Sequence, residues 1–200
     1  MPQRRVNSLP LVDFWSAFRD KAPPFFHPDD EVLLRQRRAS LFTERALVKN
    51  FDKYVRSSKF SETRSSEFQL NPLPQPYSGD LRRARIFLLL LNPGFSDPLD
   101  LYAELENQSY RAKKIRTLRQ HVKSAAFPFK SLDPSNCWTG GYRWWQGKFR
   151  EVIGAVAKRM DCSYYQASKL VSERIAAVQL IPYHSSKCPF GKKLSRTSHL

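Results

Sequence analysis

An Asn-Pro-Gly-Phe corner at residues 92–95 carries the residue types in this chain that are best suited to chemistry. It follows the apolar run 84–91 directly and precedes Ser-Asp-Pro, which is typical of a helix start. Proline fixes φ, and glycine lets the backbone approach a ligand closely. An asparagine at the carboxyl end of a buried strand directs its amide into the crevice where α/β proteins bind ligands. The amide oxygen can accept a hydrogen bond from a water molecule and so hold it in place. The alternative is a plain turn in which Asn92 caps its own loop.

A second corner, "LIPYHSSK" at residues 180–187, ends another apolar stretch. His184, beside Tyr183, has the chemistry to hydrogen-bond an oxygen that gains charge as a leaving group departs. The competing interpretation is a buried histidine whose ring is satisfied by backbone groups. Ser185 has no G-x-S-x-G context, so it is not predicted to be an acyl-transfer nucleophile. The sequence also has no P-loop, dinucleotide-binding or H-E-x-x-H motif.

Aromatic and basic side chains alternate in the segment 127–145. Aromatic faces beside cations suit stacking on an unpaired base, and we predict Tyr142 and Arg143 as the exposed candidates, with Trp145 in the core. The alternative is that the aromatic residues only cover the core at a helix start. A basic stretch upstream predicts phosphate contacts, or alternatively a solvated helix face. It contains Arg111, Lys113, Lys114, Arg116 and Arg119.

The composition is that of a basic globular protein. Lys and Arg number 34 against 18 Asp and Glu, a formal net charge of +16, which favours polyanion partners unless the lineage simply prefers Arg. Three cysteines lie far apart without a C-x-x-C, so no disulfide framework is predicted. No apolar stretch reaches transmembrane length, so we expect an intracellular protein of the cytoplasm or nucleoid with no membrane partner. Ser198-His199-Leu200 resembles a peroxisomal address, but such a match arises easily by chance.

Strands are predicted at 85–91 and within 174–187. The first shows no polar alternation and is therefore expected to be buried on both faces, central and parallel. Helices are predicted at 11–20, within 31–56, and at 97–108, 110–122, 144–160 and 163–173. This order predicts an α/β fold, a three-layer sandwich with a mostly parallel central sheet and helices on both faces, preceded by an α-helical N-terminal extension. The predicted domains are a helical extension and connector at 1–70 and an α/β core at 71–200.

The segment "LLLLNPGFS", residues 88–96, resembles the first motif of the uracil-DNA glycosylase superfamily, in the Asn-Pro-Gly form of the mismatch-specific uracil and thymine glycosylases. By this resemblance Asn92 is a catalytic residue that positions the water attacking the sugar carbon. The family's motif usually begins with a glycine, whereas Leu90 and Leu91 occupy that place here. The resemblance assigns substrate contacts to Pro93 and Gly94 at the pocket floor, and to Phe95 or Tyr102 as the stacking face.

The second corner loosely resembles the late His-Pro-Ser motif of the superfamily. In that motif the histidine stabilises the departing base, and the loop enters the minor groove. By this resemblance His184 is catalytic, Tyr183 and Ser185 contact substrate, and Lys187 contacts nucleic acid, although the proline here precedes the histidine. Alternatively, this strand end corresponds to the family's middle strand and the late motif is missing. The family fold implies at least one more strand and helix after residue 187, and a truncated C-terminus would explain their absence.

These patterns predict a DNA-base glycosylase-like hydrolase, acting in DNA repair on the N-glycosidic bond of a deaminated or damaged, uracil-type base. The expected partner is nucleic acid, with DNA favoured over RNA, and no metal or organic cofactor is expected. Two alternatives stay open: a non-catalytic nucleic-acid-binding module on the same fold, and an enzyme acting on a small nucleotide-like ligand. The oligomeric state is not predicted.

Overall fold

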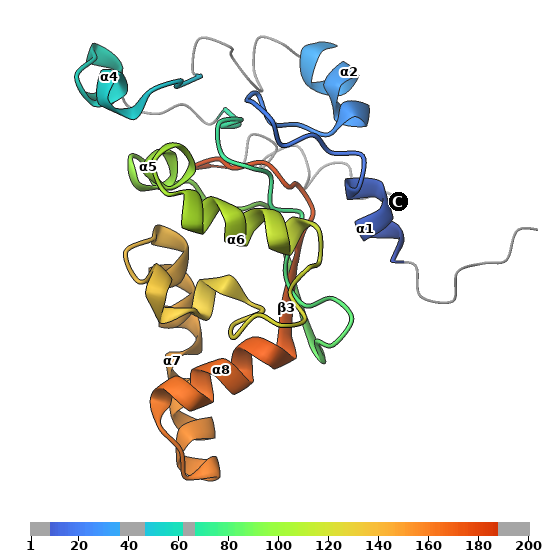
Figure 1. Cartoon of the computed structure of the whole chain (residues 1–200), viewed down its shortest axis with the longest axis vertical. Coiled ribbons are helices and arrows are strands. Elements are labelled where there is room, and N and C mark those ends of the chain that lie inside the picture. Colours follow the sequence, from blue (N-terminus) through green and yellow to red (C-terminus); the bar gives the residue numbers. More distant parts are fainter. Residues whose placement is uncertain (1–8, 37–46, 62–66, 188–200) are drawn as a thin grey trace, which may run out of the picture.

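A small mixed sheet organises the residues that the computed structural model describes, which are 9–36, 47–61 and 67–187. Within them the sheet has three strands, β1 (Tyr77–Gly79), β2 (Ile86–Leu90) and β3 (Ile175–Gln179), in the order β1-β3-β2. β2 runs parallel to β3, and β1 runs antiparallel to it (Figure 1). The predicted three-layer sandwich with a mostly parallel central sheet is therefore wrong, because the described chain is helix-rich and its sheet is small and mixed.

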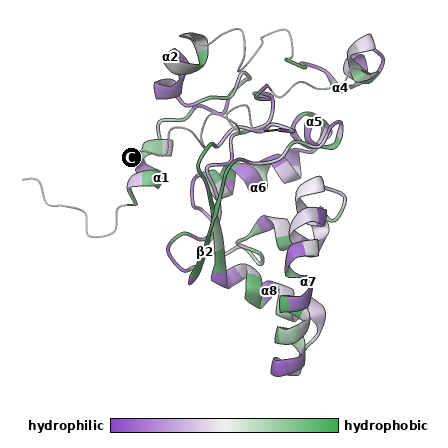
Figure 2. Ribbon diagram, turned by 180° about the vertical axis from the view of Figure 1, so that it is seen from behind, coloured by the Kyte–Doolittle hydropathy of each residue, from purple (hydrophilic) through white to green (hydrophobic). Residues whose placement is uncertain are grey.

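The strand predicted to be central, β2, is an edge strand of this sheet. Its parallel pairing with β3 is as predicted, but its burial is not, since Ile86, Phe87 and Leu89 are 55%, 50% and 82% exposed. Leu88 and Leu90 point the other way and pack on a core cluster beneath the sheet. Figure 2 shows β2 from the side on which no helix covers it. An unbroken apolar run carries no polar alternation, so its sequence does not reveal that one face is bare.

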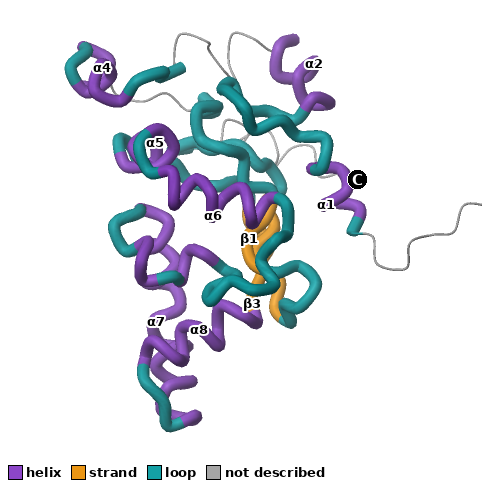
Figure 3. The backbone as a smooth tube through the Cα atoms, in the orientation of Figure 1, coloured by secondary structure: helices purple, strands orange, loops and turns teal. Residues whose placement is uncertain are grey.

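The structure describes seven α-helices. They are α1 (Pro10–Trp15), α2 (Pro28–Gln36), α4 (Phe51–Val55), α5 (Leu99–Leu105), α6 (Gln108–Leu118), α7 (Gly140–Met160) and α8 (Tyr164–Arg174). Of these, α6 and α8 contact the sheet, whereas α2 and α4 lie away from it (Figure 3). Short 3-10 turns are η2 (Ser58–Ser61), η3 (Lys130–Leu132) and η4 (Pro134–Asn136). Four of these helices, α4, α6, α7 and α8, start at a residue whose side chain accepts a hydrogen bond from a free backbone N–H. These residues are Asn50, Asn107, Thr139 and Ser163. The Thr139 cap starts α7 at Gly140, earlier than the predicted 144, so the aromatic segment 127–145 ends inside a helix.

The N-terminal aromatic residues share a core with the later part of the chain. Trp15, Phe18 and Phe25 belong to the same buried cluster as Tyr77 and Tyr183. A second cluster lies between the sheet and the pair α7–α8, where the Phe129 and Trp145 rings meet edge to face at 4.8 Å. Residues on both sides of position 70 therefore pack together, and the division into 1–70 and 71–200 stays a prediction.

Two predictions about location can be compared with the structure only for the residues that it describes. No helix among the described residues has the length and apolar character needed to cross a bilayer. The tripeptide Ser198-His199-Leu200 lies outside the described residues, as does the segment 37–46 between α2 and α4.

Gly79, at the end of β1, has a backbone that a side chain would strain. Its φ is +87°, and a Cβ there would lie 2.5 Å from the carbonyl oxygen of Ile175. We expect Gly79→Ala to lower the free energy of unfolding by about 1–3 kcal/mol, measured by urea denaturation. Gly147 in α7 is the matched control, because a Cβ there meets nothing within 4 Å and alanine should stabilise the helix by about 0.5–1 kcal/mol. Equal effects of the two substitutions would contradict this explanation.

Candidate functional site

A cavity of about 350 Å³ lies at the carboxyl ends of β2 and β3, where parallel strands of α/β proteins present their ligand sites. The corner after β2 contributes Asn92, Pro93 and Gly94, and the segment after β3 contributes His184. α5, α6, η3 and the start of α7 supply the other walls. The start of α7 lies very close to the segment that follows Gly94, because a Cβ on Gly140 would lie 2.5 Å from Oγ of Ser96. Small-molecule sites span roughly 300–1,000 Å³, so this cavity has room for a small ligand or a single base.

The side-chain amide of Asn92 is held in one orientation. Its Nδ2 donates to the carbonyl oxygen of Pro93 at 2.9 Å and to Oγ of Ser185 at 2.8 Å. A carbonyl can only accept a hydrogen bond, so the atom that faces it must be the NH₂ group. The backbone N–H of Ser185 donates to the same carbonyl at 3.3 Å, which ties the two corners together. Oδ1 accepts no hydrogen bond from any described residue and is left as an acceptor.

His184 is buried, and its ring bridges two segments of backbone. Nδ1 lies 2.8 Å from the carbonyl oxygen of Gly94, and Nε2 lies 3.1 Å from that of Leu73. Burial, helped by the positive charge of Lys114, lowers the pKa of His184 to about 3, although the two carbonyls act in the opposite direction. A neutral imidazole has one N–H and can donate to only one of these two carbonyls, but both ring nitrogens face backbone. This geometry favours the backbone-satisfied histidine over a group that assists a departing base.

A buried charge cluster from α5 and α6 forms another wall of the cavity. Glu104 accepts a hydrogen bond from Nζ of Lys114, and its other oxygen lies 3.4 Å from the guanidinium of Arg111. Asp100, one turn earlier in α5, accepts the backbone N–H of Ser96 at 2.5 Å, and burial raises the pKa of its carboxyl group. From the sequence we interpret both acids as charges at a helix N-terminus and Lys114 as a phosphate contact. In the structure Glu104 and Lys114 neutralise each other inside the protein.

Lys130, in η3, is a cavity residue that sequence reasoning missed. Its side chain is only 4% exposed, and Nζ donates to Oε1 of Gln75 at 3.1 Å. It makes no ion pair with any described residue, and it lies 5.6 Å from the centre of the Tyr110 ring. Burial first, and then the charge of Lys114, lowers the pKa of Lys130 to about 7. A lysine inside the apolar segment "FPFKSL" is the signal that could have identified it.

The exposed aromatic side chain of the cavity is Trp144, which is 50% exposed and has Nζ of Lys148 5.8 Å from its ring centre. The aromatic residues predicted for stacking lie elsewhere. Phe95 packs on the cluster around Tyr54 and Leu101. The other two predicted stacking residues do not line the cavity either, because Tyr102 packs edge-on against Phe51 and Tyr142 lies in the first turn of α7. Tyr183, predicted to contact substrate, is also not in the cavity lining; it is buried, and its hydroxyl donates to Asp30.

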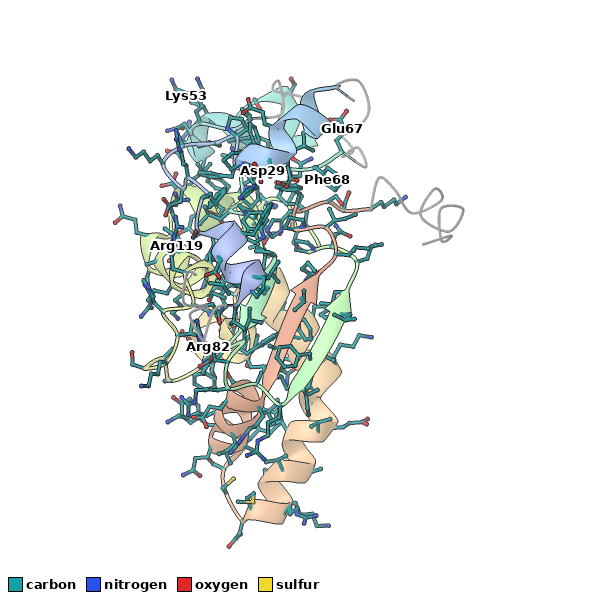
Figure 4. All side chains as sticks on the ribbon, turned by 90° about the vertical axis from the view of Figure 1, so that its right-hand side faces the viewer. Asp29, Lys53, Glu67, Phe68, Arg82 and Arg119 are labelled. Carbon is teal, nitrogen blue, oxygen red and sulfur yellow. The ribbon has the colours of Figure 1, made fainter. Side chains whose placement is uncertain are left out.

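Most of the basic residues predicted to contact phosphates are engaged within the protein. Arg111 donates to the carbonyl of Asp20 at 2.6 Å, and Lys113 contacts the carboxylate of Asp133 at 2.8 Å. Arg119 points toward the end of α1, where it donates to the carbonyls of Ser16 and Phe18 (Figure 4). Three predicted contacts are exposed on the described surface: Arg116, Arg143 and Lys187.

Among the described residues, no three or more His, Cys, Asp and Glu side chains gather in a way that could hold a metal ion. Comparisons with family models, with curated proteins and with solved structures gave no match to this chain.

Proposed function

We propose that this protein is a glycosylase-like hydrolase that releases a uracil-type base from DNA by attacking the sugar carbon with water. The observation that carries the proposal is the orientation of Asn92. Two acceptors hold its Nδ2, so Oδ1 is left to accept a hydrogen bond in a residue that lines the cavity. The resemblance of residues 88–96 to the first motif of the uracil-DNA glycosylase superfamily supports the same role.

In the proposed reaction Asn92 orients the water and does not deprotonate it, because an amide is not a base at neutral pH. The bond between the sugar carbon and the base nitrogen breaks, and the base leaves with the electron pair. The water oxygen then bonds to the sugar carbon and loses a proton, and the departed base anion takes up one proton, so that the products are the neutral base and the sugar hydroxyl. The base must be turned out of the stack to reach such a cavity, which is the usual strategy for chemistry on a base.

Release of free base is the test of this function. Oligonucleotides carrying uracil in single strands, opposite guanine and opposite adenine, and thymine opposite guanine, are incubated with the protein. Free base is then quantified by chromatography, with Asn92→Ala as the inactive control. Release by the wild type supports the proposal, and no release from any of these substrates contradicts it.

Trp144 is proposed to stack on the extruded base. Stacking is worth about 1–3 kcal/mol per base, so Trp144→Ala is expected to raise KM by roughly 10- to 100-fold with a smaller change in kcat. Tyr142→Ala is the matched control, since Tyr142 occupies the same turn of α7 but does not line the cavity. Steady-state kinetics of base release separates the two variants, and equal KM values for them would exclude stacking on Trp144.

A second candidate is an enzyme that acts on a small nucleotide-like ligand in the same cavity. The internal contacts of Arg111, Lys113 and Arg119 favour it, because these cations are not free to bind a DNA backbone. The affinity of a DNA-binding enzyme for oligonucleotides falls steeply as salt increases, whereas this candidate predicts almost no salt dependence. A salt titration of oligonucleotide binding therefore distinguishes the two functions.

A further inference from the structure

Lys130 presents an amine to the cavity that the proposed hydrolysis does not use. We propose that this amine forms an imine with an aldehyde held in the cavity, namely the open form of the deoxyribose that remains after base release. The identity of the aldehyde rests on the proposed function, whereas the reactivity of the amine does not. The outcome is covalent capture of the abasic product.

The geometry leaves the nitrogen of Lys130 available. The side chain is buried and lines the cavity, and its hydrogen bond to another described residue is the one it donates to Oε1 of Gln75 at 3.1 Å. A neutral amine can donate that bond and keep its lone pair for a carbonyl carbon. No described carboxylate lies within ion-pair distance to hold the nitrogen as an ammonium ion.

Burial and the nearby cations also favour the neutral amine, whereas the carboxylates of Glu104 and Asp100 act against it. The titratable groups that face it are Asp100 and Glu104 on α5, Tyr110, Lys113 and Lys114 on α6, and His184 after β3. Glu104 is occupied by Lys114 and Arg111, so its charge is largely compensated. Burial and the repulsion from Lys114 bring the pKa of Lys130 to about 7, against 10.5 for an ordinary lysine. Desolvated lysines beside a second cation are the type that enzymes use for imine chemistry.

The step needs no oxidant, reductant or metal. The nitrogen lone pair attacks the aldehyde carbon and forms a carbon–nitrogen bond, and the carbonyl oxygen is protonated and leaves as water. The products are the imine and one water molecule. Hydrolysis of a nucleoside leaves a hemiacetal whose open form carries its aldehyde at the same carbon that the water attacked. Asn92 and Lys130 line one cavity, so the aldehyde is generated beside the amine.

Reductive trapping on an oligonucleotide with a ready-made abasic site tests the proposal. Borohydride converts an imine into a stable adduct, and peptide mass spectrometry of the wild-type protein locates it. We expect the adduct on Lys130, and none with the tetrahydrofuran analogue, which has no aldehyde. Lys130→Met should lose the adduct, while Lys158→Met, at an exposed position on α7, should keep it.

The pH dependence provides a test that requires no variant. With a small aldehyde such as glycolaldehyde, labelling of Lys130 should rise with a midpoint near pH 7, well below the alkaline range in which ordinary lysine side chains react. Adducts confined to other lysines, an unchanged adduct in Lys130→Met, or no adduct at all would overturn the proposal. Because the abasic site is supplied, trapping without base release would refute only the hydrolase, and base release without trapping would refute only the imine.

Discussion

Replacing Asn92 with alanine is expected to lower the rate of base release by roughly 100-fold or more without loss of the fold. Alanine removes the acceptor that orients the water, while Pro93, Gly94 and the hydrogen bond from the N–H of Ser185 remain. Single-turnover kinetics with saturating protein measures this step apart from product release. The thermal midpoint of the variant should stay close to that of the wild type, since Asn92 is only partly buried.

Ser185→Ala provides an intermediate variant that tests whether Asn92 orients the water. It removes one of the two acceptors that hold Nδ2 of Asn92 but leaves the carbonyl of Pro93 in place. We therefore expect a loss of activity smaller than that of Asn92→Ala. Full activity in Asn92→Ala would mean that water is positioned by another group, and equal losses in both variants would mean that Ser185 itself contacts the reacting atoms.

Removing the carboxylate of Glu104 is expected to lower the free energy of unfolding by about 3–5 kcal/mol. Its partner Lys114 is buried, so Glu104→Ala leaves an ammonium group without a counter-charge in the wall of a cavity that already contains Lys130. Domains of this size are stable by about 5–15 kcal/mol, so the loss is a large share of the total. Urea denaturation followed by tryptophan fluorescence measures it.

Two controls separate the buried pair from a general effect of removing acidic residues. Glu151→Ala, on the exposed face of α7, should change stability by less than about 0.5 kcal/mol. The double variant Glu104→Leu/Lys114→Met replaces both charges with apolar side chains and should be more stable than Glu104→Ala alone. If Glu104→Ala matches Glu151→Ala, the pair contributes nothing to folding.

Two of the three described strands, β2 and β3, and the corners that follow them could be predicted from local sequence, whereas β1 was not predicted. Apolar runs that end at Asn92-Pro93-Gly94 and at residues 180–187 are typical of buried strands, and β2 and β3 lie within the predicted limits. Their parallel pairing also placed both corners at one end of the sheet. The position of β2 at the edge of the sheet could not be predicted, because an apolar run looks the same in a central strand and in an edge strand with an exposed face.

The composition of the cavity depended on long-range contacts that no local pattern encodes. Lys114 belongs to a basic stretch, and only the position of Glu104, ten residues away on another helix, draws it inward. Lys130 is buried because η3 packs against α7 and α8. Trp144 instead of Tyr142 faces the cavity because the Thr139 cap fixes where α7 begins, and therefore which side chains point inward.

The bare face of β2 affects how the protein behaves in a salt titration. Uncovered apolar side chains beside a strand edge that pairs with no described strand are a template for association between copies. At low ionic strength the net charge of +16 keeps copies apart, and added salt screens that repulsion. Salt that releases oligonucleotide will thus also promote self-association, and a drop in binding can come from either process. Light scattering recorded at each salt concentration separates the two.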